Sequence, residues 1–300
     1  DSRASTCATL VGLKTTRTNG LVLIAVVVAF HGGTVAAAAS PQPAHPAAAL
    51  IEKGAVEMRS DPDASRRDAE AALAQLRARP DVDLEIRARL LLCDYQSERD
   101  QQALDAQIAA IEALLPRSGR PGLRAGMLVC QGEMRETLGD NAQALAYYEQ
   151  AARVASEARD DEMIAGVLFS RGYVRGLQGE YALGLADLRR AQGLYETLDM
   201  RHHALTAMNG IAILYNRMGD YAQARDIYTA ALARQREAGM LREQAVTLHN
   251  LGRAHEYLQE WAEARRSFTE SLALHREIHC ARGQAYALRG LAAVANGLGD

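Results

Sequence analysis

The sequence repeats itself at a fixed interval of forty residues. A glycine followed by an acidic residue marks the interval, and Gln259-Glu260 takes its place once. The glycine pairs are Gly139-Asp140, Gly179-Glu180, Gly219-Asp220 and Gly299-Asp300. Small residues recur five positions after the first member of the pair, at Ala144, Gly184, Ala224 and Ala264. A chain with this period folds as an array of similar units, each of which buries its apolar face against its neighbours.

The spacing of apolar residues within the unit predicts helices. Apolar positions are separated by steps of three and four residues, and no stretch after residue 45 alternates as a strand would. Seven residues before the marker pair the chain again has a small residue. These positions are Gly132, Gly172, Ala212, Gly252 and Ala292.

This pattern resembles the tetratricopeptide repeat, a unit of two antiparallel helices. The resemblance implies an all-α, right-handed superhelical solenoid in which the small residue on the first helix admits the neighbouring helix. The usual unit has roughly 34 residues and a proline after its second helix. Here the proline positions hold Ser156, Glu196, Arg236 and Arg276, so the sequence is similar to a subclass with a forty-residue period. We expect chain breaks at Arg159-Asp160, Asp199-Met200, Gly239-Met240 and His279-Cys280.

The repeat frame divides the chain into successive segments. We expect full repeats at residues 125–164, 165–204, 205–244 and 245–284, and only the first helix of another at 285–300. Residues 85–124 form a degenerate repeat, with Pro116 in the place of the helix-ending proline. Residues 40–84 are predicted to be a linker and an amino-terminal capping helix pair that turns at Asp61-Pro62-Asp63.

Residues 1–39 have the features of a secretory signal peptide. Arg3, Lys14 and Arg17 precede the apolar run "LVLIAVVVAF", and Ala37-Ala38-Ala39 offers a cleavage site before Ser40. Ten apolar residues are too few to span a bilayer, which needs about twenty. We therefore expect cleavage between Ala37 and Ser40 and export to the periplasm. The alternative is an uncleaved anchor, if the apolar run extends through the alanines.

Charge and motifs favour a binding protein over an enzyme. The net charge is only −3, and removing residues 1–39 makes it more negative, so we expect no basic face for nucleic acid. The sequence holds no phosphate-binding glycine loop, zinc-protease motif or nucleophile elbow, so we expect no catalytic residue, cofactor or metal in these 300 residues. The odd set Cys93, Cys130 and Cys280 remains after the signal. A bridge between Cys93 and Cys130 is one interpretation, and two small buried thiols is the other.

The first helices of such repeats line a concave groove in the resembled family. Its groove positions lie ten, six, three and two residues before the marker glycine. Carried onto this sequence, they give six candidate binding residues: Tyr173, Asn209, Asn216, Arg217, His249 and Arg253. Asn and Arg can hydrogen-bond the backbone of an extended peptide, and aromatic rings add contact area. We expect Asn209 and Arg253 to lie outside the core between helices; the alternative is that all six are ordinary solvated residues.

The family's carboxylate clamp, a Lys and an Asn at the first two groove positions, is not matched. Val129 with Glu133, and Phe169 with Tyr173, stand there instead. The resemblance therefore gives no reason to expect binding of a chaperone's carboxy terminus.

The stretches "YVRGLQGEYALGLADLRRAQGLYE" and "LTAMNGIAILYNRMGDYAQARDIYTAALA" make the chain resemble the exported sensor region of bacterial membrane-bound GGDEF proteins. The resemblance implies a peptide- or protein-binding module that is tethered to the inner membrane in the full-length protein. It also implies that this module regulates a carboxy-terminal diguanylate cyclase in signal transduction. These 300 residues contain no GGDEF motif. The alternative function is a stand-alone periplasmic scaffold for envelope or secretion assembly.

Overall fold

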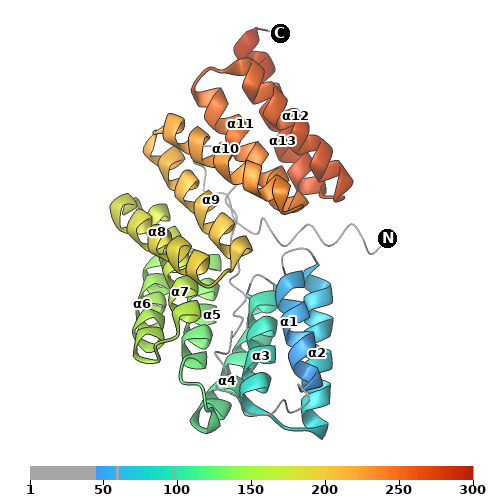
Figure 1. The fold of residues 1–300 in the computed structure, drawn as a ribbon, viewed down its shortest axis with the longest axis vertical. Helices are drawn as coiled ribbons and strands as arrows, with labels where there is room; N and C mark the ends of the chain where they lie inside the picture. The colour runs from blue at the N-terminus through green and yellow to red at the C-terminus, as the bar shows by residue number, and fades with distance from the viewer. Residues whose placement is uncertain (1–44, 59–60, 98, 300) are drawn as a thin grey trace. The chain divides into compact units, whose positions relative to one another are not determined.

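The computed structural model describes residues 45–58, 61–97 and 99–299, and these residues form helices joined by short turns, without any strand (Figure 1). The all-α class is thus confirmed for the described part of the chain. The expected signal segment at residues 1–39 lies outside it. The helices are α1 Pro46–Glu57, α2 Pro62–Ala78, α3 Val82–Gln96, α4 Gln101–Leu114, the 3-10 helix η2 Leu115–Arg117, α5 Leu123–Thr137, α6 Asn141–Glu157, α7 Asp161–Leu177, α8 Tyr181–Thr197, α9 Arg201–Met218, α10 Tyr221–Glu237, α11 Leu241–Tyr257, α12 Trp261–Glu277 and α13 Ala281–Leu298.

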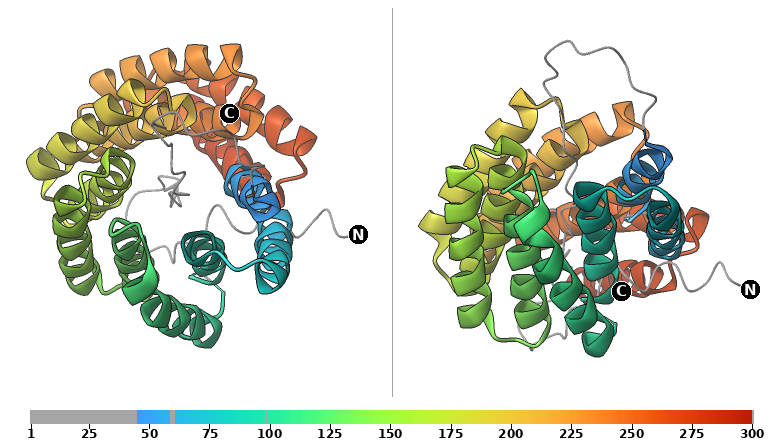
Figure 2. Two further views of the ribbon diagram at one scale, coloured as in Figure 1. Left: turned by 60° about the horizontal axis from the view of Figure 1, so that its bottom comes forward. Right: turned by 90° about the horizontal axis from the view of Figure 1, so that it is seen from below.

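The described residues fall into two compact units, with the boundary inside α7 after Val174. We name them the amino-terminal unit (residues 45–174) and the carboxy-terminal unit (residues 175–299). In the amino-terminal unit, α1, α2 and α3 lie side by side (Figure 2) and share a core that includes Ile51, Ala69 and Leu91. In the carboxy-terminal unit, each helix from α8 to α13 packs against the next.

The glycine-acid pair has two roles at Gly139-Asp140 and Gly219-Asp220, whereas at Gly179-Glu180 only the glycine has its role, because Glu180 makes no capping hydrogen bond. The glycine adopts a left-handed conformation after the first helix of a repeat, with φ of 80° at Gly139 and 85° at Gly219. The following aspartate then caps the second helix, because the carboxylates of Asp140 and Asp220 accept hydrogen bonds from the backbone N–H groups of Gln143 and Gln223. Where its acidic residue is aspartate, the repeating motif therefore ends one helix and caps the next.

The breaks expected between repeats occur where the sequence places them. Second helices end at Glu157, Thr197, Glu237 and Glu277, and each next helix begins four residues later. The residues between them adopt positive φ angles, with 53° at Arg159, 54° at Asp199, 66° at Gly239 and 54° at His279. The turn expected at Asp61-Pro62-Asp63 is also found, since Asp61 caps α2 through the N–H of Ala64. Eight helices, α5 to α12, occupy residues 123–277.

Bulky residues on second helices pack directly against small residues on first helices. A Cβ atom added to Gly132 would lie 2.4 Å from the ring of Tyr148, and one added to Gly252 would lie 2.8 Å from the ring of Phe268. Both rings are fully buried. Gly132 and Gly252 therefore lie at close helix crossings, as expected. Gly172, the third glycine expected at such a crossing, is buried.

We predict that Gly252→Leu lowers the free energy of unfolding by about 1–3 kcal/mol, because the new side chain must displace the ring of Phe268. Urea denaturation measures the change. The matched control is Gly193→Leu on α8, where a Cβ atom meets nothing within 4 Å. That control should gain about 0.5–1 kcal/mol from helix propensity. Equal effects of the two substitutions would contradict the close crossing at Gly252.

Candidate functional site

Five of the six candidate residues lie on two first helices of the carboxy-terminal unit. Asn209, Asn216 and Arg217 belong to α9, and His249 and Arg253 belong to α11. Tyr173 lies on α7 within the amino-terminal unit, where it is buried. We call these five residues on α9 and α11 the candidate row; Tyr173 belongs to the other unit.

Asn209 is a buried residue of the contact between α9 and α11. Its side chain is 4 % exposed, and its amide Nδ2 donates to Oγ1 of Thr247 at 2.7 Å. The expectation that Asn209 lies outside the core between helices is wrong, because Thr247 on the neighbouring first helix reaches it directly. Its carbonyl Oδ1 has no hydrogen-bond partner among the described residues.

Asn216 and Arg217 stand at the carboxyl end of α9. Asn216 is 3 % exposed, yet neither its amide nitrogen nor its oxygen has a partner among the residues that the structure describes. Arg217 lies beside the last carbonyl of α7, with its Nη2 3.4 Å from the oxygen of Leu177. A cation at this helix end is favourable, because the last carbonyls carry partial negative charge. Arg217 thus has a structural contact, whereas the Asn216 amide retains its full hydrogen-bonding capacity.

His249 is a neutral, buried imidazole. Its ring lies 5.4 Å from that of Phe268 and 6.0 Å from that of Tyr286, centroid to centroid. Burial and, to a smaller extent, the positive charges of Arg253, His275 and Arg289 together lower the pKa of His249 to about 3. Both ring nitrogens lack partners within the described part of the chain. At neutral pH this ring offers one donor and one acceptor.

Arg253 is held by its own helix. Its guanidinium donates to Glu256 Oε2 and to the hydroxyl of Tyr257, each at 2.8 Å, and it lies 4.9 Å from the centroid of the Tyr257 ring. Its side chain is only 13 % exposed. These contacts fix the direction of the guanidinium, which would otherwise carry much rotational freedom.

Two polar residues near the candidates were missed by the sequence reasoning. Thr247 and Asn250 are fully buried on α11, and the Asn250 amide has no partner among the described side chains and backbone. A signal for Thr247 existed in the repeat frame: the equivalent residues forty positions apart are the apolar Met127, Val167 and Ala207. A polar residue at a position that is otherwise apolar indicates a specific contact, here the one with Asn209.

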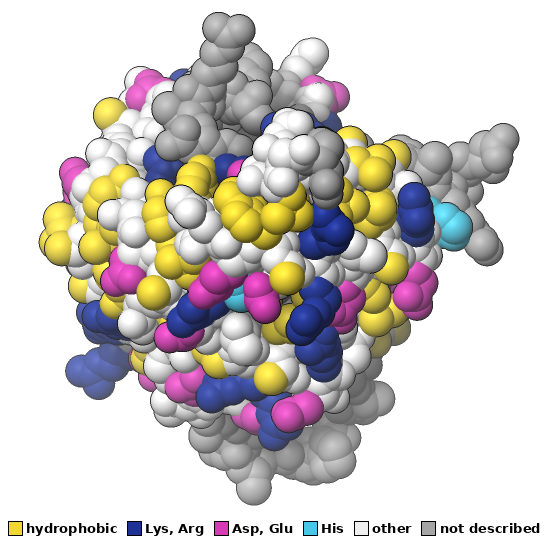
Figure 3. All heavy atoms as spheres, turned by 90° about the horizontal axis from the view of Figure 1, so that it is seen from above, with side chains coloured by type: hydrophobic (Ala, Val, Ile, Leu, Met, Phe, Trp, Pro, Cys, Tyr) yellow, Lys and Arg dark blue, Asp and Glu magenta, His cyan; other side chains and the backbone are white. Residues whose placement is uncertain are grey.

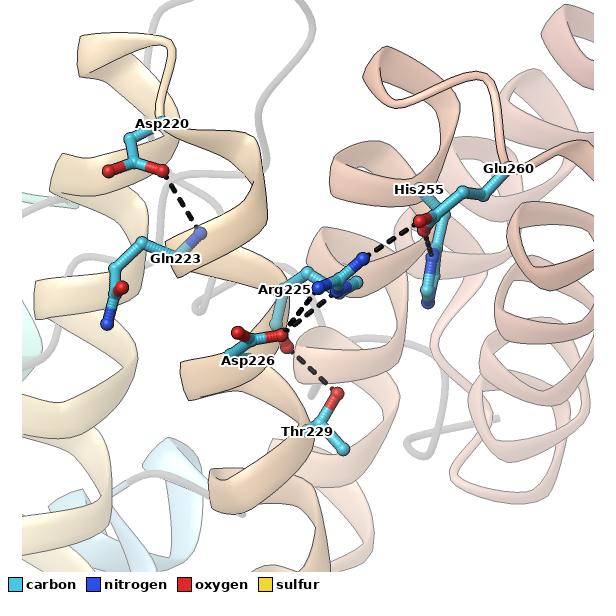
Figure 4. Close-up of polar contacts among 7 residues, drawn as sticks. All are labelled: Asp220, Gln223, Arg225, Asp226, Thr229, His255 and Glu260. Carbon is cyan, nitrogen blue, oxygen red and sulfur yellow. Dashed lines mark hydrogen bonds and ion pairs between the residues drawn. The ribbon is translucent and has the colours of Figure 1, made fainter.

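His255 takes part in an ionic contact between repeats (Figure 4). Its Nδ1 lies 2.5 Å from Oε2 of Glu260, and Oε1 of Glu260 accepts from Arg225 of α10 at 2.8 Å. The hydrogen bond with His255 and the charge of Arg225 lower the pKa of Glu260. Glu260 stands at the position of the capping residues Asp140 and Asp220, and its carboxylate links α10 to α11 instead of capping α12.

The cysteines of the amino-terminal unit are free. Cys93 and Cys130 are both buried thiols, so the interpretation as small buried residues is confirmed over a bridge. The Cys130 Sγ atom lies 3.9 Å from Oδ1 of Asp94. Burial raises the pKa of this carboxyl well above its usual value. Within the described residues no cluster of three side chains suited to a metal ion is found.

Charged side chains of both signs lie on the face of the molecule seen in Figure 3. On the face seen in Figure 3, basic and acidic side chains alternate with hydrophobic ones, and neither sign dominates. None of the described helices combines the length and the hydropathy that a membrane span requires.

Comparison with known protein families finds two matches in this chain. Residues 163–237 and residues 244–279 each match a model described as tetratricopeptide repeat. These ranges cover most of α7 to α12, so the tetratricopeptide resemblance is confirmed for this part of the chain. The forty-residue subclass and the GGDEF-type sensor region stay predictions. A comparison with curated protein sequences found no match.

Solved structures with the same helix-pair solenoid include peptide-bound and free forms. A Rap protein complexed with Competence and Sporulation Factor is 16 % identical, with 84 % of this chain and 72 % of that chain covered and a TM-score of 0.65. The apo form of the quorum sensor NprR from B. thuringiensis is 17 % identical (84 % and 71 % covered, TM-score 0.61). NprR in complex with its cognate peptide NprX is also 17 % identical (86 % and 75 % covered, TM-score 0.58). At such low identity these likenesses show the fold.

The buried histidines predict a loss of stability on mild acidification. Burial lowers the pKa of His249 to about 3 and that of His275 to about 4. The unfolded chain binds these protons near pH 6.5, so it takes up more protons than the folded chain below that pH. The contribution of each histidine to stability is therefore full above about pH 6.5 and falls as the pH decreases. At pH 5 we expect a loss of about 2 kcal/mol for each histidine.

Urea denaturation at pH 7 and pH 5 measures this loss. In His249→Gln the free energy of unfolding should differ between pH 7 and pH 5 by about 2 kcal/mol less than in the wild type. His202→Gln, at an exposed position of α9, serves as the control and should leave the difference unchanged. The lowered pKa of Glu260 does not interfere, because its effect is lost only below its unfolded value of 4.5. If His249→Gln loses as much stability between pH 7 and pH 5 as the wild type does, His249 does not have the lowered pKa described above.

Proposed function

We propose that this chain is a peptide- or protein-binding sensory module, whose ligand lies along the first helices α9 and α11. The observation that carries the proposal is the set of buried polar groups without partners on these helices: Oδ1 of Asn209, the amide of Asn216 and the ring nitrogens of His249. A buried polar group that lacks a hydrogen bond costs about 1–3 kcal/mol. The backbone of an extended peptide can supply the missing donors and acceptors.

The similar structures support this proposal. A Rap protein and NprR, which share the solenoid fold with this chain, are described in complex with Competence and Sporulation Factor and with the peptide NprX. Arg253 adds a directed positive group to the row, and the Tyr257 ring that holds it adds an apolar surface. The chemistry of the row thus suits a peptide with backbone groups to pair and at least one acidic or carbonyl group near Arg253.

The substitution Asn216→Leu tests the peptide site. It should weaken binding about tenfold, because it removes one or more hydrogen bonds to the ligand. The free energy of unfolding should stay constant or increase, because the buried amide has no partner in the free protein. The ligand would be the tightest-binding member of a random octapeptide library selected on the wild-type chain. Fluorescence anisotropy gives the affinities.

Gln235→Leu is the matched control. Gln235 on α10 is also fully buried with an unpartnered side-chain amide, but it lies on a second helix. Its replacement should have the same effect on stability and none on affinity. If the library yields no binder, or if both substitutions change affinity alike, the peptide site on α9 and α11 is not present.

We further propose that the module is exported to the periplasm and regulates a carboxy-terminal output domain, a diguanylate cyclase. The proposal is based on the signal-like residues 1–39 and on the resemblance of the repeats to exported GGDEF sensor regions. The second candidate function, a periplasmic scaffold, is favoured by the mixed charge and scattered apolar groups of the surface in Figure 3. The two differ in whether ligand binding changes the activity of an attached domain.

An alkaline phosphatase fusion after residue 60 tests export. We expect an active reporter in cells, because this enzyme is active in the periplasm only. Val27→Arg should abolish the activity, because a charge in the apolar run costs about 2.5–3.5 kcal/mol of insertion. Ser40→Arg, outside that run, is the control for the added charge itself. Reporter activity that survives Val27→Arg would contradict export through this segment.

A further inference from the structure

Thr247 of α11 holds one half of the Asn209 amide and leaves the other half open. Its Oγ1 atom accepts from Nδ2 of Asn209 at 2.7 Å, while Oδ1 of Asn209 has no partner among the residues that the structure describes. Nδ2 and Oδ1 are joined to the same carbon and point in different directions, so a hydrogen bond at Nδ2 fixes the direction of Oδ1. The open atom of this amide is therefore a hydrogen-bond acceptor.

The hydrogen bond of Thr247 differs from those of other threonines in the carboxy-terminal unit. The hydroxyls of Thr206, Thr229 and Thr269 each donate to the carbonyl four residues earlier on the same helix, at 2.7 to 2.9 Å. Such local bonds are common for a threonine inside a helix. Thr247 is fully buried, and its hydroxyl bonds Asn209 on the neighbouring first helix instead. Since a buried hydroxyl without a partner is costly, this contact explains a threonine where the equivalent residues are apolar.

Asn216, seven residues further along α9, offers a different set of groups. Both its amide nitrogen and its amide oxygen lack partners within the described part of the chain. Seven residues are nearly two helical turns, so Asn209 and Asn216 lie on the same side of α9. Asn216 can pair with an N–H and a C=O group of a ligand, whereas the bond with Thr247 leaves Oδ1 as the open atom of Asn209. The two amides therefore distinguish between groups of a peptide backbone.

We propose that Thr247 is a positioning residue of the peptide site, which turns Oδ1 of Asn209 toward the ligand so that this atom accepts a backbone N–H group. The inference rests on the proposed function, because it concerns the same ligand. It narrows the class of peptide: the residue that meets Asn209 carries a backbone N–H, which excludes proline at that place. A peptide without this donor leaves the buried oxygen unpaired and so loses affinity.

Ester analogues of the selected octapeptide test this inference on the full chain. In each analogue an oxygen atom replaces one backbone N–H, which removes the donor at nearly the same size. Fluorescence anisotropy gives the loss of affinity of each analogue relative to the parent peptide. In the wild type we expect one ester position at which the loss is about tenfold and disappears in Asn209→Leu. This position identifies the ligand residue that meets Asn209.

Thr247→Val should reduce the loss at that position to within about threefold, because the Asn209 amide is then free to turn its nitrogen toward the ligand. Valine suits the space, since Val167 stands at the equivalent position of α7. Thr247→Ser keeps the hydroxyl and should keep the full loss. Thr229→Val is the matched control and should also keep it, because this exposed hydroxyl bonds its own helix, α10. Circular dichroism melting checks that each variant is folded.

An equal loss in Thr247→Val and in the wild type would overturn the positioning role. A reduced loss in Thr247→Ser or in Thr229→Val would also overturn it, as would a scan in which Asn209→Leu changes the loss at no position. These results would leave the peptide site itself standing, because the comparison of Asn216→Leu with Gln235→Leu judges that site separately. If no octapeptide binds, the proposed function fails, and the role of Thr247 fails with it.

Discussion

Contact between an aromatic ring and a glycine backbone sets the spacing of helices where Tyr148 meets Gly132 and where Phe268 meets Gly252. Phe268 shows it most fully, because its ring lies against two glycines, Gly252 of α11 and Gly290 of α13. The ring thereby fixes the distance of its own helix from the first helix of its own repeat and from that of the next. The same ring packs against His249, so the geometry that joins the repeats also buries the imidazole and lowers its pKa. Core packing and the candidate site thus depend on one side chain.

The candidate site contains polar groups that are buried from water by the core and have no hydrogen-bond partner among the described residues. Asn216 and His249 are nearly inaccessible, yet their hydrogen-bonding atoms have no partners among the described residues. Such an arrangement lowers the stability of the free protein. A ligand that pairs with these groups would restore the lost free energy, so binding and stability are linked at the same atoms. The Glu260 contact differs, because its charges are already paired with Arg225 and His255.

The repeat frame predicted the helices and their breaks because these depend on local features. A left-handed residue at Gly139 or His279 ends a helix whatever lies around it, and the small residues at 132 and 252 indicate close crossings. The sequence likewise marked Pro116 as a helix end, and α4 ends at Leu114, just before it. The burial of Asn209 could not be predicted in this way, because it depends on the contact of α9 with Thr247, 38 residues away.

The left-handed turns are not distributed evenly. Inside repeats they are glycines, with the exception of Gln259, whereas the junctions between repeats hold Arg159, Asp199 and His279, with Gly239 as the exception. A side chain in this conformation costs about 1 kcal/mol, and a glycine avoids the cost. The backbone strain is therefore concentrated where one repeat meets the next. Under mechanical tension the chain should accordingly yield at these junctions first and release intact helix pairs one after another, in discrete steps of extension.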